Sequence, residues 1–142
     1  MLAVVAVFSG LSNAQNPAGG IPAPPSEINA VDVEGDKGEA IEVYWRLSPN
    51  DPSASAMPDL NTDTPAQVEQ YTIYRRLADG ADEFTEIGTQ TYGVSTFTDS
   101  NVEEGVSYIY GVAADSEAGS SELTVMVYPV AAVMQWFDHE KM

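Results

Sequence analysis

Residues suited to acid–base, nucleophilic or metal chemistry are few and scattered in this sequence. His139 is the single histidine and lies near the C-terminus, and there is no cysteine. A Ser/His/Asp relay needs a positioned histidine, and a thiolate nucleophile or metal ligand needs a cysteine. Neighbouring carboxylates such as Glu103 and Glu104 carry little information, because 22 residues are acidic. The sequence also lacks a Gly-rich phosphate loop, and we predict no enzyme activity and no cofactor.

One acidic stretch, "DLNTD", spaces oxygen ligands as the first half of a calcium-binding loop does. Asp59, Asn61 and Asp63 occupy the alternating ligand positions. The sixth position is Thr64, where such loops need glycine, and the twelfth is Gln70, where they need glutamate. We therefore predict no metal site, and keep Asp59, Asn61 and Asp63 only as an alternative calcium-binding set.

Length and charge limit the class of protein. With 142 residues the chain suits one domain with a real core. Five basic and 22 acidic residues give a net charge of −17, which repels the phosphate backbone of nucleic acids and an anionic lipid surface. Nucleic acid is therefore excluded as an expected partner. Without cysteine, stability must come from packing and not from disulfides.

The two ends differ from the acidic middle. Residues 1–21 carry no charge and resemble a secretory signal, with an apolar run from Leu2 to Phe8 and small residues before a cleavage point after Ala14. This run is far shorter than the ~20 residues of a membrane-spanning helix, so a segment retained and held by a partner is the alternative. Residues 130–142 combine small apolar residues with Met134, Trp136 and Phe137. Such a tail suits a partner's groove or a membrane interface, or it folds back onto its own domain.

Between the ends, apolar residues alternate with period two between turn-forming residues, which predicts short antiparallel strands. The stretch "AIEVYWRL" shows the pattern, and Asp79-Gly80 marks a turn that leads to Phe84 and Ile87. Seven strands are expected, near residues 26–33, 40–47, 71–76, 84–87, 95–100, 108–114 and 122–128. The expected inward-facing residues are Ile28, Ala30, Ile41, Val43, Trp45, Leu47, Tyr71, Ile73, Phe97, Tyr108, Tyr110, Val112, Ala114, Leu123, Val125 and Val127, with Thr72 and Tyr74 facing outward.

These motifs together resemble a fibronectin type III domain over residues 22–129. They are the "PAPPSEINA" entry, Trp45 in the second strand, "YTIYRR" in the third, and "VEEGVSYIYGVAADSEAGSSE" for the final turn and hairpin. The resemblance implies an all-β, seven-stranded antiparallel immunoglobulin-like sandwich, here with irregular N- and C-terminal extensions. It also implies that Tyr108 is the tyrosine corner, whose hydroxyl bonds back to the backbone of the preceding turn. That turn has Glu104 where the family usually has proline. The expected structural core residues are Trp45, Tyr71, Tyr108 and Tyr110.

The segment 48–67 is longer than the connection that the family usually has between its second and third strands. Four prolines interrupt it, at 49, 52, 58 and 65, and prevent a regular strand. Loops beyond ~12–15 residues are usually functional or disordered. We interpret this one as a partner-contact arm with Met57 and Leu60 as its apolar points, the alternative being a passive solvated loop.

Domains of this family are mostly spacers and docking modules, and the last hairpin has no Arg-Gly-Asp. We therefore expect a non-catalytic accessory subunit that docks on the extracytoplasmic side of a larger, membrane-bound protein assembly and stabilises it through its termini and long loop. Bacterial photosynthetic or respiratory complexes are among the candidate hosts. The termini are also expected to contact the membrane interface. The alternative is a secreted module that binds polysaccharide or a cell surface through Tyr44, Tyr74 and Tyr92. The expected partner-binding residues are Leu2, Val5, Phe8, Met57, Leu60, Met134, Trp136 and Phe137.

Overall fold

The computed structural model describes residues 20–54, 67–80 and 83–134, and within these ranges every regular element is a β-strand. Three strands, β2 (Ser26–Asp32), β3 (Ile41–Arg46) and β6 (Thr96–Asp99), form one antiparallel sheet in the order β2-β3-β6. The larger sheet has the order β10-β7-β4-β5, with β8 and β9 also paired to β7. Its strands are β4 (Gln70–Leu77), β5 (Thr85–Thr91), β7 (Ser107–Ser116), β8 (Gly119–Ser120), β9 (Thr124–Val125) and β10 (Val130–Ala131).

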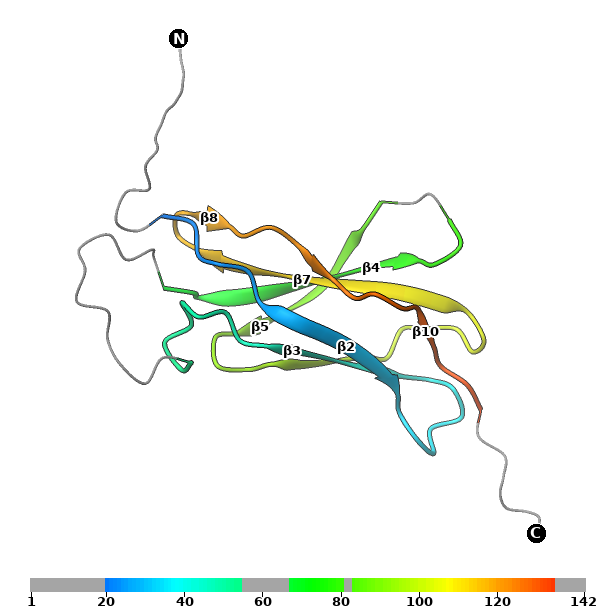
Figure 1. Cartoon of the computed structure of the whole chain (residues 1–142). Coiled ribbons are helices and arrows are strands. Elements are labelled where there is room, and N and C mark those ends of the chain that lie inside the picture. Colours follow the sequence, from blue (N-terminus) through cyan, green and yellow to red (C-terminus); the bar gives the residue numbers. More distant parts are fainter. Residues whose placement is uncertain (1–19, 55–66, 81–82, 135–142) are drawn as a thin grey trace.

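The two sheets pack face to face as a sandwich (Figure 1). Alternation decides which side chains enter the core, because successive residues of a strand point to opposite faces. In β3, Ile41, Val43 and Trp45 are buried while Tyr44 and Arg46 between and after them are exposed. Gly88 of β5 lies directly over the Phe97 ring of β6, where an added Cβ would come within 2.5 Å of the ring. The absence of a side chain there lets these two edge strands approach each other.

Strand β7 is the centre of the larger sheet. Its residues Tyr108, Tyr110, Val112 and Ala114 are buried, as the period-two pattern predicts. It pairs with β4 from Tyr108↔Leu77 to Asp115↔Gln70 and with three short strands on its other side. In β4, Thr72 is expected to face outward, yet it is 5% exposed, because its hydroxyl is covered by and donates to the Asp115 carboxylate.

The last part of the sandwich differs from the single strand that the sequence predicts. Instead of one strand over residues 122–128, the chain forms β8, β9 and β10 in succession. The inward assignment of Val125 and Val127 is wrong: they are 39% and 80% exposed, and Met126 between them is buried. Strand pairing continues beyond Pro129 into β10, and Ala132 after it is fully buried.

The described chain begins and ends at opposite ends of the sandwich (Figure 1). The entry segment at Gly20–Ser26 and the start of the 48–67 loop lie at one end. The β2–β3 turn, the turn at Gly105 and the last described residue, Met134, lie at the other. Among the described residues no helix is long and apolar enough to cross a membrane.

Candidate functional site: an apolar edge

Most of the expected partner-binding residues lie outside the described ranges. This holds for the alternative calcium ligands Asp59, Asn61 and Asp63, and for Leu2, Val5, Phe8, Met57, Leu60, Trp136 and Phe137. These assignments therefore stay predictions. Within the described ranges, no group of three or more acidic residues, histidines or cysteines could hold a metal ion.

Met134 is the one expected partner-binding residue whose place is described. It is half-buried, and its backbone N–H donates to Glu104 Oε2 over 3.4 Å. The Glu104 side chain also packs on Gly38, where an added Cβ would lie 2.8 Å from Glu104 Cγ. Glu104, which stands where the family usually has proline, thus joins the β2–β3 turn to the C-terminal segment.

The four expected core residues are all buried and lie in the sandwich interior. Trp45 from β3 and Tyr71 from β4 meet across the two sheets with ring centroids 5.6 Å apart. Tyr108 OH accepts the Glu103 N–H over 3.0 Å, which is the backward hydrogen bond of a tyrosine corner. Tyr110 is fully buried beside it.

A buried hydrogen-bond network around Asp51 closes the end of the sandwich from which the long loop leaves. Asp51 is 1% exposed and accepts the Tyr71 hydroxyl over 2.7 Å and the Gly93 N–H over 2.8 Å through Oδ2. Its Oδ1 accepts the Ser53 N–H over 2.7 Å. Burial, and after it the hydrogen bond to Asp51, raises the pKa of Tyr71 well above its usual value of 10.0. These hydrogen bonds give the carboxylate a structural role.

A second buried carboxylate, Asp99, joins the two sheets at the end of β6. Its Oδ2 accepts Arg75 Nη1 over 2.9 Å and the Tyr110 hydroxyl over 2.6 Å, and its Oδ1 accepts the Asn101 N–H over 3.1 Å. The Arg75 guanidinium also lies 4.8 Å from the Tyr108 ring centroid. Burial, and after it the hydrogen bond to Asp99, raises the pKa of Tyr110 well above 10.0. Burying the Arg75–Asp99 ion pair costs desolvation free energy. The additional hydrogen bonds from Tyr110 and Asn101 to Asp99 offset part of that cost.

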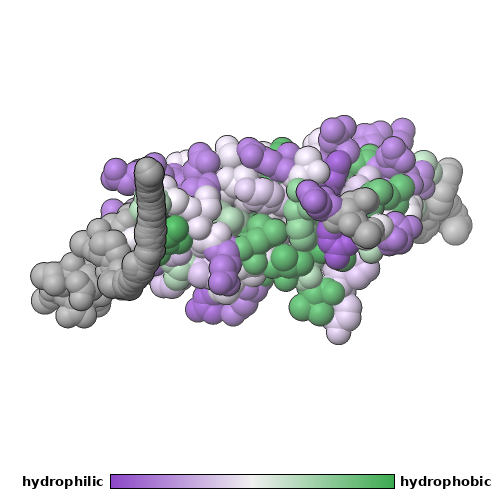
Figure 2. Space-filling model, turned by 90° about the horizontal axis from the view of Figure 1, so that it is seen from above, coloured by the Kyte–Doolittle hydropathy of each residue, from purple (hydrophilic) through white to green (hydrophobic). Residues whose placement is uncertain are grey.

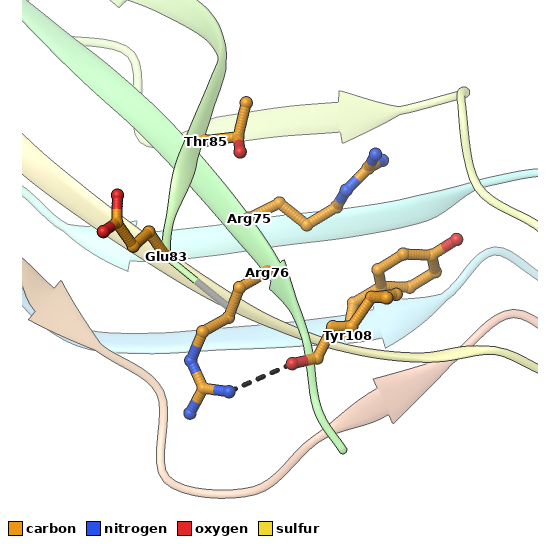
Figure 3. Close-up of a pocket in the computed structure, with 6 residues that line it drawn as sticks. Arg75, Arg76, Glu83, Thr85 and Tyr108 are labelled. Carbon is orange, nitrogen blue, oxygen red and sulfur yellow. Dashed lines mark hydrogen bonds between the residues drawn. The ribbon is translucent and has the colours of Figure 1, made fainter. Parts of the chain in front are cut away.

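A pocket of about 260 Å³ lies over β4 and β5 and contains two arginines (Figure 3). Figure 3 shows Arg75 and Arg76 leaving β4 in different directions, so their charges do not converge. Arg75 is held by Asp99 and by the Asn101 carbonyl oxygen. Arg76 donates to the carbonyl oxygens of Leu77 and Gly80 and stacks 5.5 Å from the Phe84 ring centroid. Both guanidinium groups already donate hydrogen bonds to groups of the protein, so this pocket is poorly suited to binding an anion.

Several exposed apolar side chains belong to the strands and segments at the outer edges of the two sheets. Strand β2 is the edge of the three-stranded sheet and lies against β9 and β10 of the larger sheet. Figure 2, which views the molecule from above Figure 1, shows a patch of hydrophobic surface bordered by hydrophilic residues. No charged residue occurs from Leu123 to Met134. We call this surface the apolar edge, and its exposed residues are Val31, Val125, Val127, Tyr128 and Val133.

A bulge projects the two most exposed residues of the apolar edge. Val125 pairs with Gly111, and Val130 pairs with Tyr108. Four residues, 126–129, therefore lie opposite only Ile109 and Tyr110 of β7, so the edge strand carries two extra residues. Bulges of this kind redirect side chains. As a result, Val127 and Tyr128 are 80% and 77% exposed, while Met126 before them stays in the core.

The bulge is not visible in the sequence pattern. "ELTVMVYP" reads as regular alternation with Leu123, Val125 and Val127 on one face. Pro129 signals an interruption, because proline is confined to edge strands and bulges within sheets. The absence of charge from Leu123 to Met134 on so acidic a chain is a second signal, and it marks an unusual surface.

Two of the three tyrosines of the polysaccharide alternative lie on different sheets. Tyr44 lies on β3 of the three-stranded sheet, whereas Tyr74 lies on β4 of the larger sheet. The outer faces of a sandwich point in opposite directions, so these two rings cannot form one stacking platform. Tyr92 lies in the turn between β5 and β6.

No family model matches the sequence, and no curated protein matches it either. Solved structures match the fold. An Fn3-like protein from Clostridium thermocellum is 19% identical with a TM-score of 0.55, the match covering 83% of this chain and 98% of that one. The fn3 domain of the human collagen alpha-1(XX) chain is 16% identical with a TM-score of 0.54, covering 90% and 97%. A structure of titin kinase and its flanking domains is 15% identical with a TM-score of 0.54, covering 78% of this chain and 16% of that one.

The molecule is thus an all-β, immunoglobulin-like sandwich of two antiparallel sheets. More narrowly, it has a fibronectin type III-like fold, as the motifs predict. At these identities the likeness establishes the fold, and the function has to be argued from the surface.

Proposed function

We propose that this protein is a non-catalytic accessory subunit that docks on the extracytoplasmic side of a larger, membrane-bound protein assembly. The proposal rests chiefly on the apolar edge, where Val127 and Tyr128 are projected into solvent on a chain of net charge −17. Exposed apolar patches bordered by polar residues mark interaction sites. The segment from Leu123 to Met134 brings no carboxylate to such a contact, although the chain as a whole is strongly acidic.

The hydrogen bonding of the two buried carboxylates supports the non-catalytic part of the proposal. Asp51 and Asp99 each accept three hydrogen bonds from protein groups. A general acid or base must instead face a substrate with a proton to exchange. The extracytoplasmic location rests on the resemblance of residues 1–21 to a secretory signal. The termini and the 48–67 loop are proposed to add contacts to the same assembly.

The apolar edge is expected to provide the central contact, because aromatic residues in fully desolvated positions dominate binding energy. The test is sedimentation of detergent-solubilised native membranes that carry the tagged full chain. We expect the wild-type chain to sediment with a large assembly. The double variant Val127→Ser/Tyr128→Ser should move to the light fractions while its circular dichroism spectrum stays that of a folded β-sandwich.

Tyr92→Ser is the matched control, since Tyr92 is 48% exposed but lies on the opposite side of the sandwich, between β5 and β6. This variant should remain in the heavy fractions. A wild-type chain that sediments alone, or a double variant that stays in the heavy fractions, would contradict the proposal. Intact mass of the purified chain adds a second test: retention of residues 1–14 favours the anchored subunit, and their removal favours a secreted protein.

A further inference from the structure

Beside the apolar edge lies a pocket of about 420 Å³ that no step above has used. It is lined by Ala78 and Asp79 from the β4–β5 turn, by Gly105, Val106 and Ser107 before and at the start of β7, and by Pro129 from the bulge. Pro129 directly follows Tyr128, so the pocket adjoins the most exposed aromatic ring of the apolar edge.

The walls of this pocket are fastened to one another by backbone hydrogen bonds. The Ala78 N–H donates to the Ser107 carbonyl over 3.0 Å, which joins the β4–β5 turn to β7. The Gly105 N–H donates to the Ala132 carbonyl over 2.8 Å, which joins the turn before β7 to the segment after β10. The pocket is therefore formed before any partner arrives, and this reduces the ordering cost of binding.

Its chemistry combines apolar walls with one carboxylate. Asp79 is exposed, and among the described residues it forms no ion pair, since the recorded pairs are Arg46 with Glu27 and Arg75 with Asp99. The nearby Arg76 is occupied by the Leu77 and Gly80 carbonyl oxygens. The carboxylate is thus available to a cation, and the net charge of −17 on the chain favours a cationic ligand.

A partner cannot readily add a β-strand at this place. The bulge interrupts the edge ladder at residues 126–129, and Pro129 has no N–H to donate. Recognition must therefore run through side chains. Building on the proposed docking function, we propose that this pocket receives an arginine or lysine side chain of the partner protein, whose stem lies against Val106 and Pro129 and whose charge pairs with Asp79.

A volume of about 420 Å³ leaves room for one basic side chain. An amphipathic basic side chain buries an apolar stem and keeps its charged end at a polar rim. The partner would therefore enclose the exposed Tyr128 ring and insert a basic side chain into the adjacent pocket.

The test uses N-acetyl-arginine N-methylamide as the probe on the isotope-labelled full chain, followed by amide chemical shifts. We expect saturable shifts at Gly105, Val106 and Ser107, and weaker binding of the citrulline analogue, which lacks the charge. Asp79→Asn should weaken the probe by about fivefold, the scale of one exposed ion pair. Glu117→Gln, an exposed carboxylate in the β7–β8 turn, is the matched control and should bind as wild type. Shifts that do not saturate, or an Asp79→Asn variant that binds equally well, would overturn the inference.

This outcome is separable from that of the proposed function. If the probe fails while Val127→Ser/Tyr128→Ser still releases the chain from its assembly, only the basic side chain in the pocket is refuted. If the double variant stays assembled, the apolar edge is not the docking surface, whatever the probe does. With both inferences correct, Asp79→Asn also shifts part of the chain to the light fractions.

Discussion

Two buried tyrosine hydroxyls, those of Tyr71 and Tyr110, each donate to a buried carboxylate. In both cases burial and the hydrogen bond raise the pKa of the phenol above that of an unfolded tyrosine. A group with a raised pKa in the folded state holds its proton more firmly there. Its contribution to stability is therefore complete below the unfolded pKa of about 10 and is lost as the pH rises above it.

We accordingly expect the free energy of unfolding to fall steeply above pH 10. Each of the two tyrosines contributes about 1.4 kcal/mol per pH unit in that range. Tyr110→Phe removes one titrating group, so its slope between pH 10.2 and 11 should be smaller than that of the wild type. Urea denaturation at a series of pH values measures these slopes, and the range from pH 7 to 8.5 serves as the internal control. Equal slopes in the wild type and Tyr110→Phe would contradict the assignment.

At the scale of elements, the bulge exposes two residues proposed for binding without removing a side chain from the core. It adds two residues, an even number, so Met126 and Val130 on either side of it both face the core. Deleting Val127 and Tyr128 together would restore a continuous edge strand without reversing any face. The remaining Pro129 would then take a position whose nitrogen points away from β7, since the preceding Met126 N–H donates to Tyr110.

The double deletion is therefore expected to change the free energy of unfolding by less than about 1 kcal/mol, because no buried side chain is lost. Deletion of Val127 alone is the matched control. It shifts the strand by one residue, turns Val130 outward, and should cost clearly more, because a one-residue slip exchanges the two faces. Chemical denaturation of both variants gives the comparison. The prediction fails if the double deletion is the more damaging of the two.

The same bulge shows which part of the fold could not be predicted from the sequence. Alternation is local, so it located β2, β3, β4 and β7 and placed Ile41, Tyr71 and Tyr110 in the core. It assigned the wrong residues to the core at the end of the chain, because two extra residues leave the alternation of letters unchanged while altering the pairing. The networks of Asp51 and Asp99 were not foreseen either. Their partners lie up to 42 residues away in the sequence, and only the packing of the two sheets brings them together.

The sequence predicts partner contacts for the apolar and aromatic tail, residues 130–142, including Met134, and these contacts stay a prediction. The residues that the structure exposes most, Val127 and Tyr128, were assigned to the domain instead, Val127 to its core. Exposure depends on which strand lies at an edge, and a single sequence does not specify that order.

At the scale of the whole molecule, charge acts on both folding and docking. The two ion pairs among the described residues use Arg46 and Arg75, which leaves the excess of carboxylates facing one another across the surface. This repulsion favours expanded states. Within the apolar edge, the segment from Leu123 to Met134 carries no charge, so a partner that contacts this segment meets no carboxylate from it.

Salt should therefore stabilise the isolated domain. Raising NaCl from 0.01 to 0.15 M shortens the screening length from about 30 to about 8 Å and weakens repulsion between carboxylates. We expect the free energy of unfolding to rise by on the order of 1 kcal/mol, measured by urea denaturation at pH 7. KCl should give the same rise, because the effect depends on ionic strength and not on the cation. Binding of the arginine probe at Asp79 should weaken over the same interval, since screening reduces attraction as well. A domain that loses stability as salt is added would show that ion pairs, and not repulsion, dominate its surface.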